Sequence, residues 1–535
     1  METVLESLPD DIEKLKHLVV TYAKIAEEKS RHADELASIV DTLKEKLSEE
    51  KENYAALQRL VFGSKSEKKA PYVNRKQELL FNEAETVTDA PPVKTSTVAA
   101  HERKKSGRKP FPASLERNEV LHELSDEERA CPECGSLRPE IGEARTEELR
   151  LIPAKAVVDV HVMKKYGPCP CKACQGTERT PIIQAPGPAK IVPGSRFSNG
   201  TIAFFLTSKF VDAQPFYRME SILARWGVDT VRSTLCSLAM GAGRAISDLV
   251  TAIRDTIKAS PVIGMDETTV QVLHETNRSA QTKSYMWVAT GFKDKKRLIF
   301  FHYHPSRAGN VAAEFLKGYS GYLQTDGYSG YARVGNSPGI VHVGCMAHIR
   351  RQFYDADQAA KGTGDAAVML AMIGEFYHEE ELLRTRYEQN ELDEASFVAE
   401  RKKLQEPRLH HMYEWLAVRS RSVAPRSSLG KAISYALGQW QYMIRYLDHA
   451  LLTPDNNGLE NSIRPFVVGR KNWLFSNTPS GAHTSAGIYS LIETAKANGH
   501  EPYKYLCYIF DMLPKAKTVE EKLALLPYRL DPASY

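Results

Sequence analysis

The N-terminal part of the chain repeats apolar positions with the spacing of a coiled coil. Alternate steps of four and three residues connect Leu8 to Val61, and only Lys29 and Glu50 place a charge in this seam. Helices with such a seam wrap around one another, and charged seam positions commonly set register or partner number at some cost in stability. We therefore expect a coiled coil over residues 1–62 that joins copies of the chain into a homo-oligomer. A helical hairpin folded back on itself is the alternative.

Two segments have the composition of linkers. Residues 63–118 are rich in Lys, Glu, Pro, Ser and Thr and poor in apolar residues, which predicts disorder because little surface can be buried. The basic stretch HERKKSGRKP within it contains Arg108 and Lys109 and is similar to short hooks that enter the minor groove of DNA. A solvated basic linker is the alternative. Residues 181–200 carry four prolines and three glycines and predict a second hinge.

The segment 201–259 predicts helices, and its residues 215–242 have the pattern of a helix-turn-helix. Gly227 supplies the left-handed residue that such a turn needs, and either Asp229 or Thr230 is expected to cap the second helix. Two helices packed in a bundle would give the same pattern. The polar residues that open the second helix and could reach base edges or phosphates are Arg232, Ser233 and Thr234.

From about residue 260 the pattern changes to short β-rich runs separated by turns. The runs are SPVIGMD, SYMWVAT, RLIFFHYH, GYLQTD and GIVHVG, with the helical segment AGNVAAEFLKGY between the third and the fourth. This order predicts an α/β domain over 260–480 whose sheet has a mixed edge. Residues 361–426 are charged and helical in pattern, as in an inserted helical unit, and 481–535 predict a C-terminal helical region. The whole chain is therefore expected to be a multidomain α+β protein.

Composition limits what kind of protein this is. A chain of 535 residues with 42% apolar content is too long for one core, so about three to four domains are expected. The net charge of +4 requires any nucleic-acid surface to come from local clustering. The acidic N-terminus does not resemble a signal peptide, and no apolar run has the length of a membrane span. We expect a cytoplasmic protein without membrane contact.

Clustered cysteines predict a zinc site in the module at 119–180. Two CxxC pairs supply four soft ligands for tetrahedral Zn²⁺, and a β-like segment lies between them, as in a zinc ribbon. Without export signals, such clustering favours metal binding over disulfides. All four thiolates would be used, so the site is expected to be structural. Cys169 could replace Cys171 as a ligand. The predicted ligands are Cys131, Cys134, Cys171 and Cys174.

Three acidic residues have the pattern of a metal-ion catalytic site. Asp266 and Asp326 are each expected to end a strand, and Glu460 stands near a predicted helix start. Carboxylates at the tips of neighbouring strands can share divalent cations, and two ions about 4 Å apart can activate an attacking oxygen and stabilise a leaving one. A single Asp at a strand end is more often a cap or turn former. The basic residues expected to hold a phosphate backbone beside Glu460 are Arg464, Arg470 and Lys471.

Ordered motifs along the chain resemble one known family, the transposases of the insertion-sequence-66 family. They include FGSKSEK, LLFNEAE, SGRKPFP, CPECG, SKFVDAQPFYRMESILARWGVDTVRSTL, MDET, TDGYSGY, GCMAHIRRQFYDA, NNGLENSIRPFVVGRKNWLFSN and SLIETAKANGHEPYKYL. The resemblance implies an RNase H-like DDE domain in which Asp266, Asp326 and Glu460 bind two Mg²⁺ (or Mn²⁺) ions. It further implies a bacterial, nucleoid-associated protein that cuts DNA at element ends and joins the 3′-hydroxyl to target DNA.

The same resemblance implies that the coiled coil, zinc module and helix-turn-helix serve assembly and the binding of terminal inverted repeats, and it suggests accessory proteins of the same element. A catalytically silent DNA-binding regulator derived from a transposase is the alternative, and a nuclease that only hydrolyses DNA is a second. Two features depart from the family. The segment YGPCPCKAC is longer than usual, which leaves the zinc-ligand register open, and Asn461 follows Glu460 where the family often has Arg.

The motif GCMAHIRRQFYDA has an unassigned role. Cys345 and His348 lie three residues apart and could ligate a metal, but a packed cysteine with a hydrogen-bonded histidine is the interpretation that we favour. Arg350 and Arg351 are expected to contact the DNA backbone.

Overall fold

The computed structural model describes residues 12–13, 16–17, 19–32, 36, 155–166, 183–359 and 364–535. Residues 19–32 form an exposed helix, as expected there, and self-association through it stays a prediction. The segment with Arg108 and Lys109 lies outside the described residues, as do Cys131, Cys134, Cys171 and Cys174. Contacts divide the chain into two units, Glu83–Val158 and the remainder. All the labelled elements below belong to the remainder.

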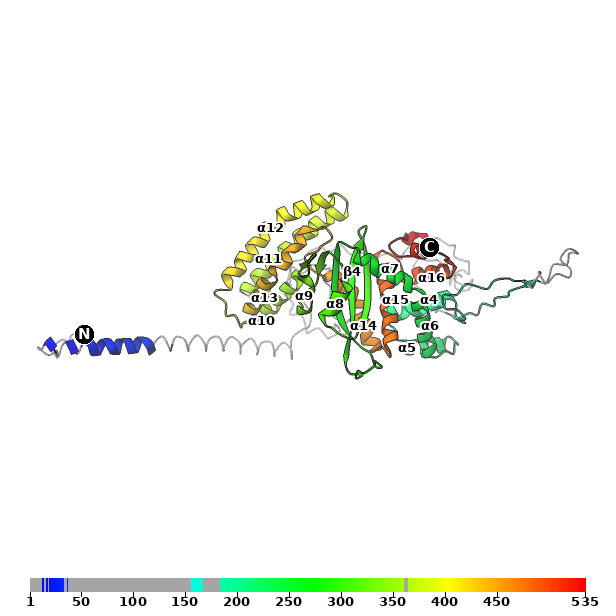
Figure 1. Ribbon diagram of the computed structural model, residues 1–535, viewed down its shortest axis with the longest axis horizontal. Coiled ribbons are helices and arrows are strands. Elements are labelled where there is room, and N and C mark those ends of the chain that lie inside the picture. The colour runs from blue at the N-terminus through cyan, green and yellow to red at the C-terminus, as the bar shows by residue number, and fades with distance from the viewer. Residues whose placement is uncertain are drawn as a thin grey trace, which may run out of the picture. The chain divides into compact units, whose positions relative to one another are not determined.

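A five-stranded mixed sheet forms the centre of this larger unit (Figure 1). Its strands follow the spatial order β5-β4-β3-β6-β7. The pairs β5/β4 and β4/β3 are antiparallel, whereas β3/β6 and β6/β7 are parallel. Each β-rich run of the sequence therefore becomes one strand, and the predicted mixed edge is confirmed. The strands are β3 (Val262–Gln271), β4 (Lys283–Lys293), β5 (Lys296–His304), β6 (Gly321–Gln324) and β7 (Ile340–Val343).

Helices cover both faces of the sheet. On one face Met265 of β3 and Val311 of α8 (Gly309–Phe315) line one small cavity, which places α8 there. On the other face the backbone of Gly264 lies beside Leu459 of α14 (Asn457–Trp473). Because both faces are covered, the sequence of β4 is almost continuously apolar rather than alternating.

The predicted helical segment 201–259 forms four helices that pack into the same core as the sheet. Their apolar faces meet α15 (Pro479–Ala497) and α16 (Pro502–Met512), so the N-terminal and C-terminal parts of this unit share one core. Asn199 ties them together, since its Nδ2 donates to the Phe510 carbonyl at 2.9 Å. The four helices are α4 (Asn199–Phe210), α5 (Phe216–Arg225), α6 (Arg232–Ala245) and α7 (Ser247–Lys258).

Helices α5 and α6 form the pair expected of a helix-turn-helix, with one correction at the turn. Gly227 adopts φ 78°, as predicted, and its N–H donates to the Ala224 carbonyl at the end of α5. The predicted cap at Asp229 or Thr230 is wrong. The chain stays extended through Val231, which is the N-cap of α6 and makes no side-chain capping bond.

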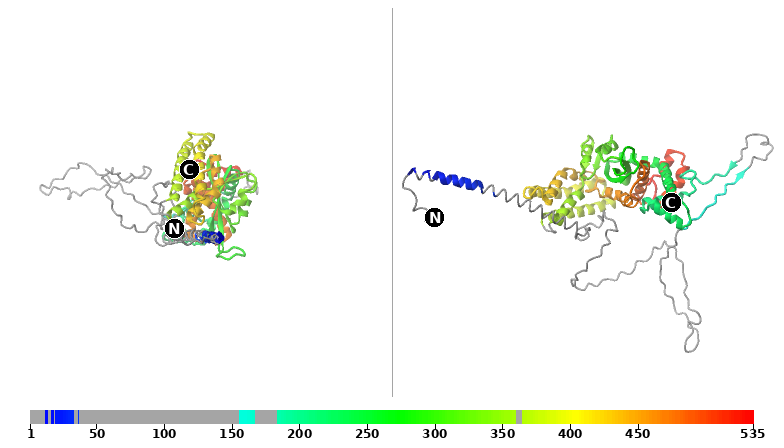
Figure 2. Two further views of the ribbon diagram at one scale, coloured as in Figure 1. Left: turned by 90° about the vertical axis from the view of Figure 1, so that its left-hand side faces the viewer. Right: turned by 90° about the horizontal axis from the view of Figure 1, so that it is seen from below.

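The inserted helical unit is confirmed, but it extends beyond residue 426. After α10 (Met346–Ala359) come α11 (Asp365–Glu388), α12 (Glu394–Arg419), α13 (Ser428–Met443) and the 3₁₀ helix η3 (Ile444–Asp448). These elements bury a second core with β7, because apolar side chains of α10 to α13 face one another. The right-hand view of Figure 2 shows these helices and the C-terminal helices on opposite sides of the sheet.

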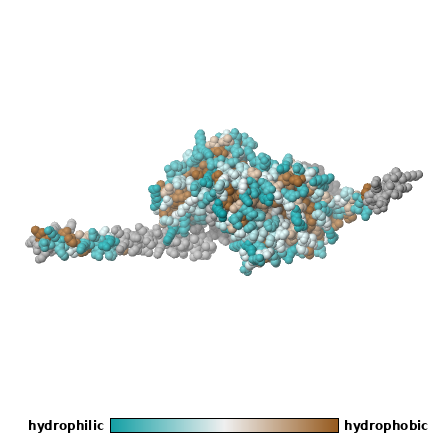
Figure 3. Space-filling view, in the orientation of Figure 1, coloured by the Kyte–Doolittle hydropathy of each residue, from teal (hydrophilic) through white to brown (hydrophobic). Residues whose placement is uncertain are grey.

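The face drawn in Figure 3 has no uniform character, because hydrophobic residues are scattered among hydrophilic ones. Within the described ranges, every helix is too short or too polar to cross a bilayer.

The remaining described elements are short. They are β1 (Lys165–Tyr166), β2 (Ile183–Gln184), η2 (Ser329–Tyr331), α9 (Ala332–Gly335), η4 (Leu513–Lys515), α17 (Val519–Ala524) and η5 (Pro532–Ser534).

Helix α15 protects the edge of the sheet at β5. The Ile299 N–H donates to Thr494 Oγ1 at 3.0 Å, and the same hydroxyl donates back to the Ile299 carbonyl at 3.0 Å. One turn earlier, Ser490 Oγ accepts the Phe301 N–H at 2.8 Å. Hydroxyl groups on a buried helix face therefore replace the missing neighbouring strand, which keeps this edge from pairing with another chain.

Replacing Thr494 with Val should destabilise the protein, because an isosteric methyl leaves the buried Ile299 N–H without a partner. We expect the free energy of unfolding to fall by about 1–3 kcal/mol. Urea titration of both proteins measures this difference. Thr251→Val, at an exposed position of α7, is the matched control and should change little. Equal stability of the two variants would show that the hydroxyl bridge contributes nothing.

Candidate active site

The parallel pairing of β3 with β6 brings two of the predicted acids together. The register joins Gly264 to Gln324. Asp266 and Asp326, each two residues farther along, therefore lie side by side on adjacent backbone segments. Asp326 lies just beyond β6, as expected. The expectation that Asp266 ends its strand is wrong, because β4 pairs with β3 as far as Gln271.

Helix α14 delivers the third acid to the same face of the sheet. Glu460 lies in its first turn. Leu459 packs over Gly264, where an added Cβ would lie 3.5 Å from Leu459 Cδ2, and farther along α14 Arg470 donates to Thr268 Oγ1 at 3.1 Å. Gly264, Asp266 and Thr268 share one face of β3 because side chains alternate along a strand. Helix α14 therefore runs beside β3 on the face that carries Asp266.

Acidic side chains are concentrated around Asp266. Although part of the residue is exposed, protein surrounds its carboxyl group, and this burial raises its pKa to about 8. The charge of Asp326 is the next largest cause, and those of Glu267 and Glu460 raise the pKa further. The Glu267 N–H donates to Asp266 Oδ1 at 2.7 Å and opposes the shift. The acids thus interact electrostatically, as groups on one surface must.

The donor chemistry of this cluster fits a hard divalent cation. Three carboxylates supply the oxygen ligands that Mg²⁺ and Mn²⁺ prefer. A bound divalent cation would neutralise their negative charges and so relieve the repulsion between them. Each of the three residues keeps some exposure to solvent. As placed, however, no three Asp, Glu, His or Cys side chains within the described ranges lie close enough together to hold a metal ion.

A further acidic residue, Glu267, lies next to Asp266 and supports the site without being one of its three predicted acids. Its Oε1 accepts from Arg307 Nε at 2.6 Å and its Oε2 accepts from the Tyr331 hydroxyl at 2.5 Å. Arg307 also stacks on Tyr328 at 3.8 Å, and the Tyr328 N–H donates to Asp326 Oδ1 at 3.0 Å. This network links the loop after Asp326 to β3. The sequence analysis missed it, and the only signal was the acidic pair in MDET.

The interpretation of Cys345 as a packed residue is confirmed. Its buried Sγ donates to Asn456 Oδ1 at 2.9 Å, and burial raises the pKa of the thiol well above its ordinary value. His348 is different from the expectation, since its buried Nδ1 has no hydrogen-bond partner. Its Nε2 lies 4.0 Å from Glu460 Oε1. The GCMAH motif therefore buttresses the helix that carries Glu460.

The predicted basic residues occupy several surfaces. Arg470 is partly used inside the fold, because its guanidinium donates to Thr268 and Thr269 of β3. DNA contact by the others stays a prediction. Those that are exposed are Arg351, Lys471, Arg232 and Ser233, and those that are half-buried are Arg350, Arg464 and Thr234.

The raised pKa of Asp266 predicts how the stability of the metal-free protein depends on pH. Above its ordinary pKa of 3.8 the unfolded chain has released this proton, whereas the folded chain keeps it until about pH 8. The unfolded state then binds fewer protons, so the free energy of unfolding falls across this window as pH rises. Asp266→Asn removes the effect and should be more stable than the wild type at high pH, by on the order of a few kcal/mol.

Thermal unfolding in the presence of a chelator, from about pH 5 to about pH 9, measures this difference. The gap in Tm between Asp266→Asn and the wild type should widen as pH rises. Asp229→Asn, an exposed substitution, should follow the wild type throughout. A gap that stays constant with pH would mean that Asp266 is ionised in the fold.

Four family models match successive parts of the chain. The "Transposase IS66 family" model covers residues 194–484, more than half of the chain, and the "IS66 C-terminal element" covers 490–528. The model described as "Transposase C of IS166 homeodomain" covers 51–120, including all of the predicted linker at 63–118. The "zinc-finger binding domain of transposase IS66" covers 128–175 and thus all four predicted zinc ligands.

The chain is also similar, over most of its length, to proteins of Sinorhizobium fredii. Uncharacterized protein y4qI of Sinorhizobium fredii is 29% identical, with 98% of each chain covered. Uncharacterized protein y4jD of the same organism is 26% identical over 93% of this chain and 97% of its own. The match to the first family model contains Asp266, Asp326 and Glu460. The chain belongs to the IS66 transposase family.

Proposed function

We propose that the protein is a DDE transposase that cuts DNA strands at the ends of an insertion sequence and joins the 3′-hydroxyl to target DNA. One observation carries the proposal. One acid lies on β3 and a second lies beside it, just beyond the parallel strand β6, and a helix from much farther along the chain carries a third acid over the same face. In a transposase family this arrangement has an evident use, because phosphoryl transfer needs charge stabilisation more than covalent chemistry.

The sheet supports an RNase H-like fold for this domain. Its order β5-β4-β3-β6-β7 has three antiparallel strands first in sequence, followed by two strands parallel to the first of them. The helical insertion separates the second acid from the third. We infer that the catalytic domain is an RNase H-like unit interrupted by α11, α12 and α13.

Asp266, Asp326 and Glu460 are the residues that would hold two Mg²⁺ or Mn²⁺ ions. Such ions, when bound, activate the attacking oxygen and stabilise the leaving one. The N–H groups of Glu267 and Tyr328 orient the carboxylates of Asp266 and Asp326. No covalent enzyme intermediate is required.

Other parts of the chain supply DNA binding and assembly in this proposal. The zinc module holds one structural Zn²⁺, and the coiled coil joins copies of the chain. Accessory proteins of the same element assist, in a bacterial cytoplasm where the protein associates with the nucleoid. The residues that contact terminal inverted repeats or target DNA are Arg108, Lys109, Arg232, Ser233, Thr234, Arg350, Arg351, Arg464, Arg470 and Lys471.

Strand transfer tests the catalytic proposal directly. Purified protein is incubated with labelled element ends, Mg²⁺ and plasmid, and joined molecules are counted. Asp266→Asn and Glu460→Gln should each lose several kcal/mol of transition-state stabilisation, which is about a thousandfold or more in rate. Binding to the ends should stay near the wild-type level, because the DNA-binding residues are intact.

Glu520→Gln, an exposed substitution on α17, is the control and should transfer strands normally. Cleavage without joining would favour a nuclease. End binding by the wild type with neither cleavage nor joining would favour the catalytically silent regulator.

Zinc content tests the cysteine assignment. We expect about one Zn²⁺ per purified chain, because four thiolates complete one tetrahedral site. Cys131→Ser or Cys134→Ser should release the metal, and comparing Cys169→Ser with Cys171→Ser should identify the third ligand. Cys236→Ser, an exposed free cysteine, should retain full zinc. A wild type that carries no zinc after expression with the metal would contradict the assignment.

A further inference from the structure

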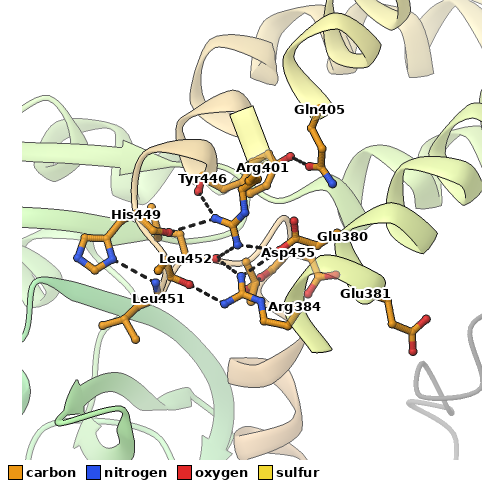
Figure 4. A network of polar contacts seen from close by, with 12 residues as sticks. Glu380, Glu381, Arg384, Arg401, Gln405, Tyr446, His449, Leu451, Leu452 and Asp455 are labelled. Atoms are coloured by element: carbon orange, nitrogen blue, oxygen red, sulfur yellow. Dashed lines mark hydrogen bonds and ion pairs between the residues drawn. The ribbon is translucent and has the colours of Figure 1, made fainter. Parts of the chain in front are cut away.

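A buried cluster of charged side chains lies where the helical insertion meets the segment before α14 (Figure 4). Arg401 of α12 is fully buried, and Glu380 of α11 accepts from its Nη2 at 2.7 Å. Arg384, one turn after Glu380, donates to the same carboxylate oxygen at 2.9 Å. Two arginines therefore share one carboxylate inside the protein.

The Nη groups of the two arginines also donate to backbone carbonyls. Arg401 Nη1 donates to the carbonyls of Tyr446 and His449 at 2.9 and 3.1 Å, and its Nη2 donates to that of Leu452 at 3.2 Å. Arg384 donates to the carbonyl of Leu452 at 2.7 Å and to that of Ala450 at 2.5 Å. The Tyr446 carbonyl lies within η3, and the other three belong to the irregular chain that leaves it. For these carbonyls the arginines replace the partners that a longer helix or a strand would provide.

The chain beyond Leu452 is held residue by residue until α14 begins. The Thr453 carbonyl accepts from Gln324 Nε2 at 2.6 Å, and the Pro454 carbonyl accepts from the Met346 N–H at 2.8 Å. Asn456, the N-cap of α14, accepts a hydrogen bond from the Cys345 thiol. Glu460 follows one turn later. Its position thus depends on a continuous series of contacts that starts at the two arginines.

Stability alone does not account for this cluster. Burying a charge is costly, and a buried ion pair is often no better than well-packed apolar side chains of similar volume. Here Arg401 Nε and Glu380 Oε2 are buried without any hydrogen-bond partner, which adds to the cost. What apolar side chains could not do is hold several carbonyls of an irregular segment in one arrangement.

We propose that Arg401 and Arg384 are positioning residues, through which the helical insertion holds residues 446–456 and so sets the place of Glu460 relative to Asp266 and Asp326. This inference rests on the proposed function for its catalytic consequence. Its structural consequence, a rigid segment before α14, can be measured without any catalysis.

The same pair of helices offers a matched control. Arg408 of α12 pairs with Glu379 of α11 through two bonds of 2.6 and 2.9 Å and with Glu375 at 2.6 Å. It thus joins α11 to α12 as Arg401 does, although its side chain is partly exposed, and none of these bonds reaches residues 446–456. Arg401→Met and Arg408→Met each remove one arginine from this helix pair, and only the first releases the segment.

Hydrogen exchange of the full-length protein is the first measurement. Arg401→Met should speed amide exchange in peptides covering 446–460 by about tenfold or more, and Arg408→Met should leave these peptides as in the wild type. The second measurement is Mn²⁺-dependent cleavage of element ends. Displacing a supporting contact of a metal ligand costs about tenfold to a hundredfold, so Arg401→Met should lose that much cleavage while end binding stays within about twofold.

Arg384→Met provides a second test should Arg401→Met fail to fold, since the Arg384 side chain is partly exposed and its loss is more easily tolerated. It should show the same two effects, more weakly. Equal exchange in the Arg401 (or Arg384) and Arg408 variants would overturn this inference. A wild-type protein that never cleaves DNA would contradict the proposed function instead. Hydrogen exchange would still decide whether the arginines hold residues 446–456 in place.

Discussion

The parallel pairing between β3 and β6 is the interaction on which the candidate site depends. Its register joins Gly264 to Gln324, so that Asp266 and Asp326, each two residues farther along, lie side by side. Leu459 then packs over Gly264, so that α14 lies along β3 with Glu460 at its start. Strand register and the packing of one helix therefore place acids that are almost two hundred residues apart in the chain.

The electrostatic state of the site follows from that geometry. Carboxylates on one sheet face, with protein around the first of them, repel one another and raise the pKa of Asp266 to about 8. Such a cluster is costly for the fold and is maintained where it has a use, because functional sites are where strongly shifted groups concentrate. Membership of the IS66 transposase family is consistent with the use proposed here, binding of divalent cations beside DNA.

The helical insertion has a defined relation to this site. Its second core packs with β7 and α10, so it is built onto the sheet rather than attached by a flexible linker. The arginines of α11 and α12 reach from it to the segment that leads into α14. The insertion between Asp326 and Glu460 is long, and these arginine contacts fix where the chain returns to the sheet at the start of α14.

Local pattern was sufficient for the elements of this protein. The β-rich runs, the helical insertion, the C-terminal helices and the turn at Gly227 could all be predicted, because each depends on periodicity or on a single residue's conformational freedom. Family motifs identified Asp266, Asp326 and Glu460. The end of β3, the cap at Val231, and the partners of Glu267, Cys345 and Arg401 could not be predicted, because each depends on contacts with residues distant in sequence. Tertiary packing, not local propensity, determines where those side chains meet.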